Sequence, residues 1–160
     1  MESAELLSML VKTQQTKQLL EIGTSTGYST LWLAKALSQT QGQMTTLEID
    51  VERSKQAKHH AKIFGLEHLI HFQVVDALDY LKQSSEVFDF ILLDAERDAY
   101  VEYWQYLPKL LNPKNGLLVV DNVLSHADQV VDFIQCVNED LRFVTSTINV
   151  GAGLLLIQYQ

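Results

Sequence analysis

The chain has 160 residues, of which 47% are hydrophobic and 20% charged, with a formal net charge of −8. A chain of this size and composition is typical of one globular domain over residues 1–160, and a single cysteine, Cys136, rules out an internal disulfide. The negative charge argues against nucleic acid as a partner, and no apolar run approaches the roughly 18 residues of a membrane span, so we expect no membrane association and a cytoplasmic location.

The first predicted elements are a helix and a strand. Four apolar residues recur at helical spacing before the strand expected at 19–22, namely Leu6, Leu7, Leu10 and Val11. We interpret this amphipathic helix as one that packs against the sheet.

The turn after this strand carries the strongest signal for a ligand. Gly23 and Gly27 allow the backbone to turn sharply and to approach a ligand closely, and the N-terminus of the next helix, expected at 28–39, favours an anionic group. The loop does not fit the dinucleotide pattern G-x-G-x-x-G, and Glu21 at the end of the strand would repel a pyrophosphate. A carboxylate there suits a nucleotide-type cofactor that carries an ammonium group.

A second acidic strand end follows at the expected distance. The strand predicted at 43–48 ends in Glu48, which is 21 positions after Gly27. A carboxylate at about this spacing binds ribose hydroxyls in nucleotide-binding α/β folds. Ile49 beside it is suited to packing on an adenine ring.

The rest of the chain continues to alternate between strands and helices. This alternation predicts a Rossmann-like, doubly wound, mostly parallel seven-stranded α/β sheet with helices on both faces. A glycine-rich corner at 150–153 makes the last strand antiparallel, and we expect Cys136 to be buried in packing. The remaining strands are expected at 70–75, 88–93, 115–120, 142–147 and 153–158, and the remaining helices at 51–64, 77–83, 97–111 and 125–138.

Five successive strands are followed by an acidic residue. Ligands of open α/β sheets bind outside the carboxyl ends of the strands, and carboxylates gathered there repel one another unless they bind a cation or a hydrogen-bond donor. Two carboxylates and an amide suit Mg²⁺, although a helix cap and a turn account equally well for the last two acids. The five acids are Glu21, Glu48, Asp76, Asp94 and Asp121, the last followed by Asn122.

Three motifs together resemble a known family. Residues 21–34 (EIGTSTGYSTLWLA), 92–100 (LLDAERDAY) and 120–124 (VDNVL) are similar to the metal-dependent O-methyltransferases of the catechol and caffeoyl-coenzyme A type, which use S-adenosylmethionine (SAM). The resemblance runs from about residue 4 to the C-terminus.

The resemblance implies a set of site residues. Glu48 would bind the ribose hydroxyls of SAM, and Ile49, Asp76 and Ala77 would frame its adenine. Asp94, Asp121 and Asn122 would hold Mg²⁺, with Asp94 also beside the cofactor. The methionine part would lie against the loop and the start of the next helix, at Glu21, Gly23, Ser25, Gly27 and Ser29.

The implied reaction is methyl transfer to a hydroxyl of a small catechol-like phenol. Arg97 stands where the family commonly has a lysine, and arginine cannot act as a general base, although its charge could stabilise a phenolate. Members of the family normally have further N-terminal helices that help to form the acceptor pocket and the dimer contact. The resemblance therefore leaves a homodimer open.

Three alternatives remain from the sequence. One is a SAM-binding protein that has lost transfer activity, through Arg97 and the short N-terminal part. Another is a nicotinamide-dependent oxidoreductase, which Glu48 supports and the glycine spacing opposes. The third is a methyltransferase for an amine or a carboxylate, which would not depend on Mg²⁺.

Overall fold

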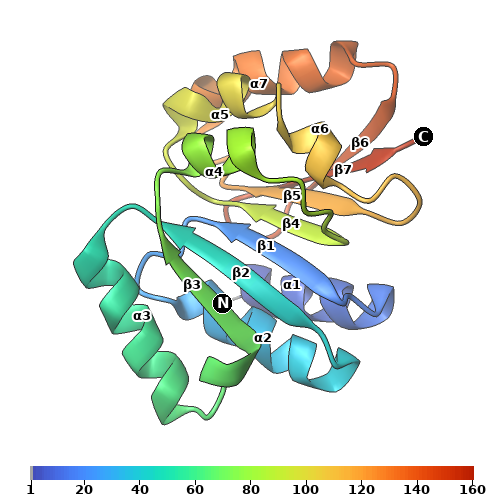
Figure 1. Ribbon diagram of the computed structural model, residues 1–160. Helices are drawn as coiled ribbons and strands as arrows, with labels where there is room; N and C mark the ends of the chain where they lie inside the picture. The colour runs from blue at the N-terminus through green and yellow to red at the C-terminus, as the bar shows by residue number, and fades with distance from the viewer. Residues whose placement is uncertain (1) are drawn as a thin grey trace.

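A seven-stranded mixed sheet forms the centre of the computed structural model, which describes residues 2–160 (Figure 1). The strand order is β3-β2-β1-β4-β5-β7-β6, with the first five strands of the chain parallel and β7 antiparallel to both of its neighbours. The predicted fold class is thereby confirmed. The strands are β1 (Gln18–Ile22), β2 (Gln43–Glu48), β3 (Ile70–Val74), β4 (Phe90–Leu93), β5 (Leu117–Asp121), β6 (Phe143–Ile148) and β7 (Leu154–Tyr159).

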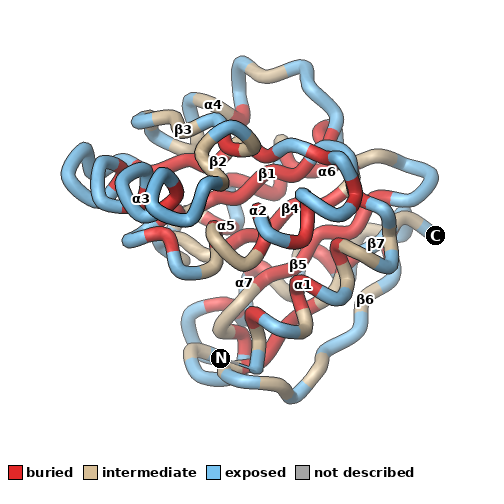
Figure 2. The backbone as a smooth tube through the Cα atoms, turned by 90° about the horizontal axis from the view of Figure 1, so that it is seen from below, coloured by how far each residue is buried: buried red, intermediate tan, exposed pale blue. Residues whose placement is uncertain are grey.

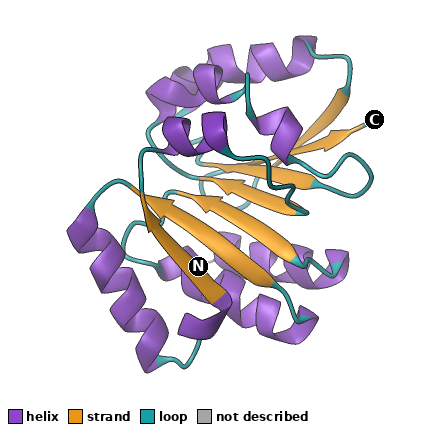
Figure 3. Ribbon diagram, in the orientation of Figure 1, coloured by secondary structure: helices purple, strands orange, loops and turns teal. Residues whose placement is uncertain are grey.

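Helices cover both faces of this sheet (Figure 3). One face carries α1 (Glu2–Gln14), α2 (Tyr28–Thr40) and α3 (Val51–Ile63), and the other carries α4 to α7 (Figure 1). None of the helices within residues 2–160 is long and apolar enough to cross a membrane. The helices of the second face are α4 (Ala77–Gln83), α5 (Tyr100–Tyr103), α6 (Leu107–Leu110) and α7 (Ala127–Glu139), and two 3₁₀ turns are η1 (Glu67–Leu69) and η2 (Arg97–Ala99).

The alternation of side chains along each strand divides the core into two layers. In β1, Leu19 packs in the layer of α1 and α2, whereas Leu20 and Ile22 pack in the layer of α4 to α7. Figure 2 shows buried backbone along the central strands. Because Glu21 follows the same alternation as Leu19, its side chain lies on the face covered by α2.

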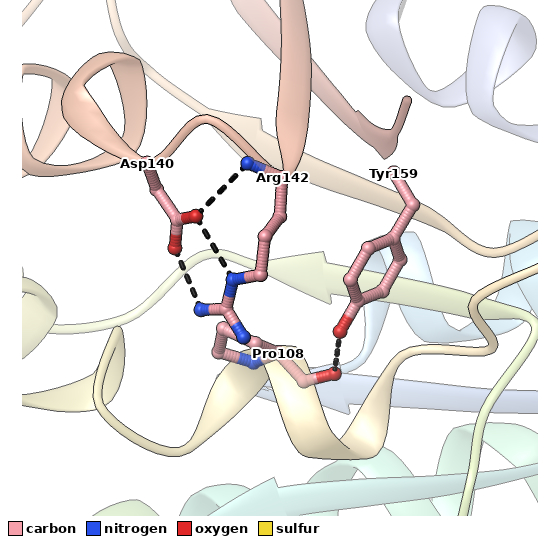
Figure 4. A network of polar contacts seen from close by, with 4 residues as sticks. All are labelled: Pro108, Asp140, Arg142 and Tyr159. Atoms are coloured by element: carbon pink, nitrogen blue, oxygen red, sulfur yellow. Dashed lines mark hydrogen bonds and ion pairs between the residues drawn. The ribbon is translucent and has the colours of Figure 1, made fainter.

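Two predictions about the second face are wrong. The helix expected over 97–111 is divided into η2, α5 and α6, because Pro108 has no N–H to continue a helical ladder and Tyr100 bonds back to Ala95. Cys136 packs against the core as expected, but it is half-buried rather than buried. The end of the sheet is also tied to α6, since the Tyr159 hydroxyl donates to the Pro108 carbonyl oxygen at 2.6 Å (Figure 4).

The N-terminal helix has the packing role expected of it. Leu7 and Val11 are buried in the layer shared with α2, at 2% and 0% exposure. The first turn of α1 also reaches the carboxyl edge of the sheet, where Ser3 and Ala4 line a cleft.

Candidate active site

Two clefts meet above the carboxyl ends of the parallel strands. The first cleft has a volume of about 440 Å³ and the second about 370 Å³, and both are lined by Gly23, Ser25 and Asp94. The first cleft also contains the predicted cofactor residues Glu48, Ile49, Asp76 and Ala77. The second contains Ser29, Asp121 and Asn122.

The loop of residues 23–27, here called the cofactor loop, is closely held by its surroundings. Gly23 has a φ of +103°, and a Cβ atom there would lie 1.9 Å from the Asp94 carbonyl oxygen. A Cβ atom on Gly27, at φ +92°, would lie 2.8 Å from the Ala57 side chain. Both positions therefore require glycine, and the loop can approach β4 and α3 only because these side chains are absent.

Glu48 has a fixed position beside this loop. Its side chain is 8% exposed and accepts hydrogen bonds from the Ser25 N–H at 2.8 Å and from the Asp50 N–H at 3.0 Å. Asp50 in turn caps α3 by accepting from Glu52 and Arg53 N–H groups. The carboxylate at the end of β2 is thus aligned before any ligand binds.

Glu21 lies beneath the cofactor loop instead of lining either cleft. It is fully buried and accepts hydrogen bonds from the hydroxyls of Ser29 at 2.6 Å, Thr46 at 2.7 Å, and Thr30. Burial raises the pKa of Glu21 to about 7, against the lowering effect of these hydroxyls. A contact between Glu21 and the methionine part of SAM stays a prediction.

Asp94, Asp121 and Asn122 come together at the junction of β4 and β5, which are adjacent strands. The Asn122 amide donates to Asp94 Oδ1 at 2.9 Å, and the Asn122 N–H donates to Asp121 Oδ1 at 2.7 Å. Burial raises the pKa of both carboxyls, and the negative charge of Asp121 raises that of Asp94 further. These three side chains are here called the junction cluster.

The chemistry of the junction cluster fits a hard divalent cation. Two carboxylates and one amide carbonyl are oxygen donors of the kind that Mg²⁺ prefers, and a cation would relieve the repulsion between the two acids. No group of three or more His, Cys, Asp or Glu side chains suited to a metal occurs within residues 2–160. The junction cluster contains only two such side chains, and its third member is an amide.

Two features that sequence reasoning missed hold this cluster in place. The Tyr100 hydroxyl accepts from the Ala95 N–H at 2.9 Å and donates to the Ala95 carbonyl at 3.1 Å, directly after Asp94. At the corner before β7, the Gly153 carbonyl oxygen accepts a hydrogen bond from the Val123 N–H at 3.2 Å. Tyr100 belongs to the 92–100 motif and residues 150–153 were expected to form a corner, but neither pattern indicated which atoms these residues contact.

Arg97 lies outside the lining of both clefts. It is the first residue of η2, is half-buried, and donates from Nε to Gln129 Oε1 of α7 at 2.7 Å. Its charge is still close enough to lower the pKa of Asp94. The predicted catalytic role of Arg97 stays a prediction.

Comparison with known proteins identifies the family. A sequence model described as O-methyltransferase matches residues 1–159. The chain belongs to the O-methyltransferase family. The prediction of a SAM-dependent O-methyltransferase of the catechol and caffeoyl-coenzyme A type is confirmed at the level of the family.

Individual members of the family give the same result. A catechol O-methyltransferase from Niastella koreensis is 37% identical over 122 residues, which are 74% of this chain and 54% of that protein. A caffeoyl-CoA O-methyltransferase from Populus trichocarpa is 34% identical over 77% of this chain and 51% of its own length, so the chain spans about half of these two relatives. The solved O-methyltransferase from Bacillus cereus, in complex with S-adenosylhomocysteine (SAH), is 27% identical with a TM-score of 0.88 over 99% of this chain and 80% of that one.

Proposed function

We propose that this O-methyltransferase transfers the methyl group of SAM to a hydroxyl of a small catechol-like phenol with the help of Mg²⁺. The observation that carries the proposal is the meeting of the two clefts at Asp94, with Asp121 and Asn122 on the side of the second cleft. A donor in the first cleft and an acceptor in the second would approach each other at this point. Alignment of the two reactants supplies much of the rate enhancement in such a transfer.

The first cleft suits the shape and charges of SAM. Glu48 presents a carboxylate, aligned by two backbone N–H groups, for the ribose hydroxyls. Ile49 is 68% exposed and lines the cleft together with Asp76 and Ala77, so it offers an apolar surface to the adenine. The methionine part would lie against Gly23, Ser25, Gly27 and Ser29, above the buried Glu21.

The second cleft would hold the acceptor at the junction cluster. Asp94, Asp121 and Asn122 would hold Mg²⁺, which when bound lowers the pKa of a coordinated phenolic hydroxyl and orients it. Arg97 stays protonated, so we assign it the role of stabilising the phenolate by charge rather than that of taking the proton. Ser3 and Ala4 of α1 also line this cleft.

The second candidate function is a SAM-binding protein that does not transfer the methyl group. The observation that favours it is the hydrogen bond between Arg97 and Gln129, which directs the Nε atom of the guanidinium toward α7. Both candidates bind SAM, so only product formation separates them. A nicotinamide-dependent oxidoreductase is opposed by the family match.

The decisive experiment measures release of SAH from SAM with catechol, with Mg²⁺ or with EDTA. Resorcinol, the isomer whose hydroxyls are not adjacent, is the matched control acceptor. We expect SAH to be released with catechol in the presence of Mg²⁺, and not in the presence of EDTA or with resorcinol. Product that persists in EDTA, or equal rates with resorcinol, would contradict the metal-assisted reaction. SAM binding without any product from a panel of vicinal diphenols would favour the second candidate.

A further inference from the structure

A third hollow lies between α2 and the C-terminal end of α3, and it borders the second cleft at Thr26 and Tyr28. This α2–α3 groove has a volume of about 530 Å³ and a mostly apolar lining. Tyr28 and Trp32 of α2 form one wall, and Phe64 and Leu66, which follow α3, form the other. Its polar side chains include Lys35 and His60.

The aromatic side chains of this groove are more exposed than folding alone requires. Phe64 is 68% exposed and Tyr28 is 54% exposed, and the adjacent Ile63 is 66% exposed. Contiguous apolar surface that remains exposed on a monomer is commonly a binding site. The volume and the lining are those of a pocket for a small aromatic molecule.

The charge around the groove indicates the sign of the ligand. Among the described residues, the groove is lined by one lysine, Lys35, and by His60, and by no Asp or Glu. Lys35 faces the groove from α2, and within residues 2–160 no carboxylate forms an ion pair with it. The ammonium group of Lys35 beside aromatic side chains is complementary to an aromatic acid.

We propose that the α2–α3 groove binds a compact aromatic anion. Its ring system would lie among Tyr28, Trp32 and Phe64, and its acid group would pair with Lys35. The groove shares only Thr26 and Tyr28 with the second cleft and contains no member of the junction cluster. Binding in the groove therefore needs no residue of the junction cluster and does not depend on the proposed methyl transfer.

The test is calorimetric titration with naphthoate and with naphthamide, its uncharged counterpart, in the presence of saturating SAH and EDTA. We expect naphthoate to bind at one site and about two- to fivefold more tightly than naphthamide, as one exposed ion pair provides. The substitution Lys35→Met should abolish this difference. Lys55→Met, which removes the same charge from an exposed position paired with Glu52, should preserve it.

A second pair of variants tests the aromatic wall. Phe64→Ala should weaken both ligands, whereas Leu141→Ala, at a position 85% exposed on the other side of the fold, should weaken neither. Equal affinities in the Lys35 and Lys55 variants, unchanged binding in Phe64→Ala, or no saturable binding of naphthoate would each overturn the proposal. No methyl group is transferred in this assay, so its failure is distinct from failure of the proposed function.

Discussion

Two carboxylates on neighbouring strands, Glu21 of β1 and Asp94 after β4, have opposite surroundings. Glu21 receives hydrogen bonds from three hydroxyls of β2 and α2. Asp94 receives one side-chain hydrogen bond, from Asn122, and has the like charge of Asp121 nearby. Both carboxyls have a raised pKa, and burial is the main cause in each case.

The difference lies between an acid whose partners are all within the fold and an acid for which we propose a metal ion as partner. The hydroxyls of Ser29, Thr30 and Thr46 replace the water that Glu21 loses on burial, and they connect the cofactor loop to β2 and α2. At Asp94 the hydrogen bond from Asn122 and the charge of Arg97 offset burial and the repulsion from Asp121 only in part, since the pKa of this carboxyl remains raised. A buried acid with a full set of partners stabilises the protein, whereas a pair of acids without them costs stability until a cation binds.

The largest expected effect is the loss of activity in Asp94→Ala. If the junction cluster holds the metal, SAH release from SAM and catechol should fall about 1,000-fold, which is on the order of 4 kcal/mol of transition-state stabilisation. The thermal midpoint should stay within a few degrees, because removing one of two repelling acids costs little. Asp98→Asn, at an exposed position of η2, is the matched control and should retain activity. Activity in Asp94→Ala above a tenth of wild type would contradict the role of Asp94 as a metal ligand.

The next effect is on the folding of Glu21→Ala. This change leaves the buried hydroxyls of Thr30 and Thr46 and the half-buried hydroxyl of Ser29 without their acceptor and opens a cavity, so the free energy of unfolding should fall by about 3 kcal/mol. Urea unfolding near about pH 5 measures it under conditions in which Glu21 is protonated. Thr46→Val, which removes one of the three donors, should cost about 1 kcal/mol. A loss of less than about 1 kcal/mol in Glu21→Ala would show that the hydroxyls satisfy one another without the carboxyl.

The same residue gives a signed pH dependence. The pKa of Glu21 is raised from 4.5 to about 7, so between these values the folded state binds more protons than the unfolded state. Stability contributed by Glu21 is therefore fully present below pH 4.5 and is lost as the pH rises through about 7. Wild type should lose about 2 kcal/mol more than Glu21→Gln between pH 5 and 7. Parallel pH curves for the two proteins would contradict the assignment.

The smallest effect is expected at a third kind of acid, Asp140. The Arg142 guanidinium donates to it at 2.7 and 2.9 Å and lowers the pKa of that carboxyl (Figure 4). Because the Arg142 side chain is 61% exposed, Arg142→Gln should lower the free energy of unfolding by only about 0.5 kcal/mol. Urea unfolding at low and high salt should show that even this amount is screened. A loss above about 2 kcal/mol would mean that exposed pairs matter here as much as buried ones.

The sequence indicated the strands well because each buried strand coincides with a short apolar run. All seven expected strands are present, and the clustering of Glu48, Asp76, Asp94 and Asp121 at the carboxyl edge followed from their being parallel. The division of residues 97–111 was missed because it depends on the bond between Tyr100 and Ala95 as well as on Pro108.

The place of Glu21 could not be read from spacing alone. A strand end that faces a ligand and one that faces a helix differ by a single step of the side-chain alternation. The donors that distinguish the two cases are Ser29, Thr30 and Thr46, and Thr46 belongs to another strand. Arg97 is similar, since its partner Gln129 is 32 positions away in the chain.

The position of β7 inside the sheet has a consequence for how the protein is made. This strand is the last in the chain, yet it lies between β5 and β6, and the corner before it accepts the N–H groups of Val123 and Leu124 next to the junction cluster. During synthesis the N-terminal half can form its parallel strands first, as nascent chains do. The cluster at the end of β5, however, gains its last support only after residues 150–159 have left the ribosome. We therefore expect the N-terminal parallel strands to form during translation before the junction cluster is complete.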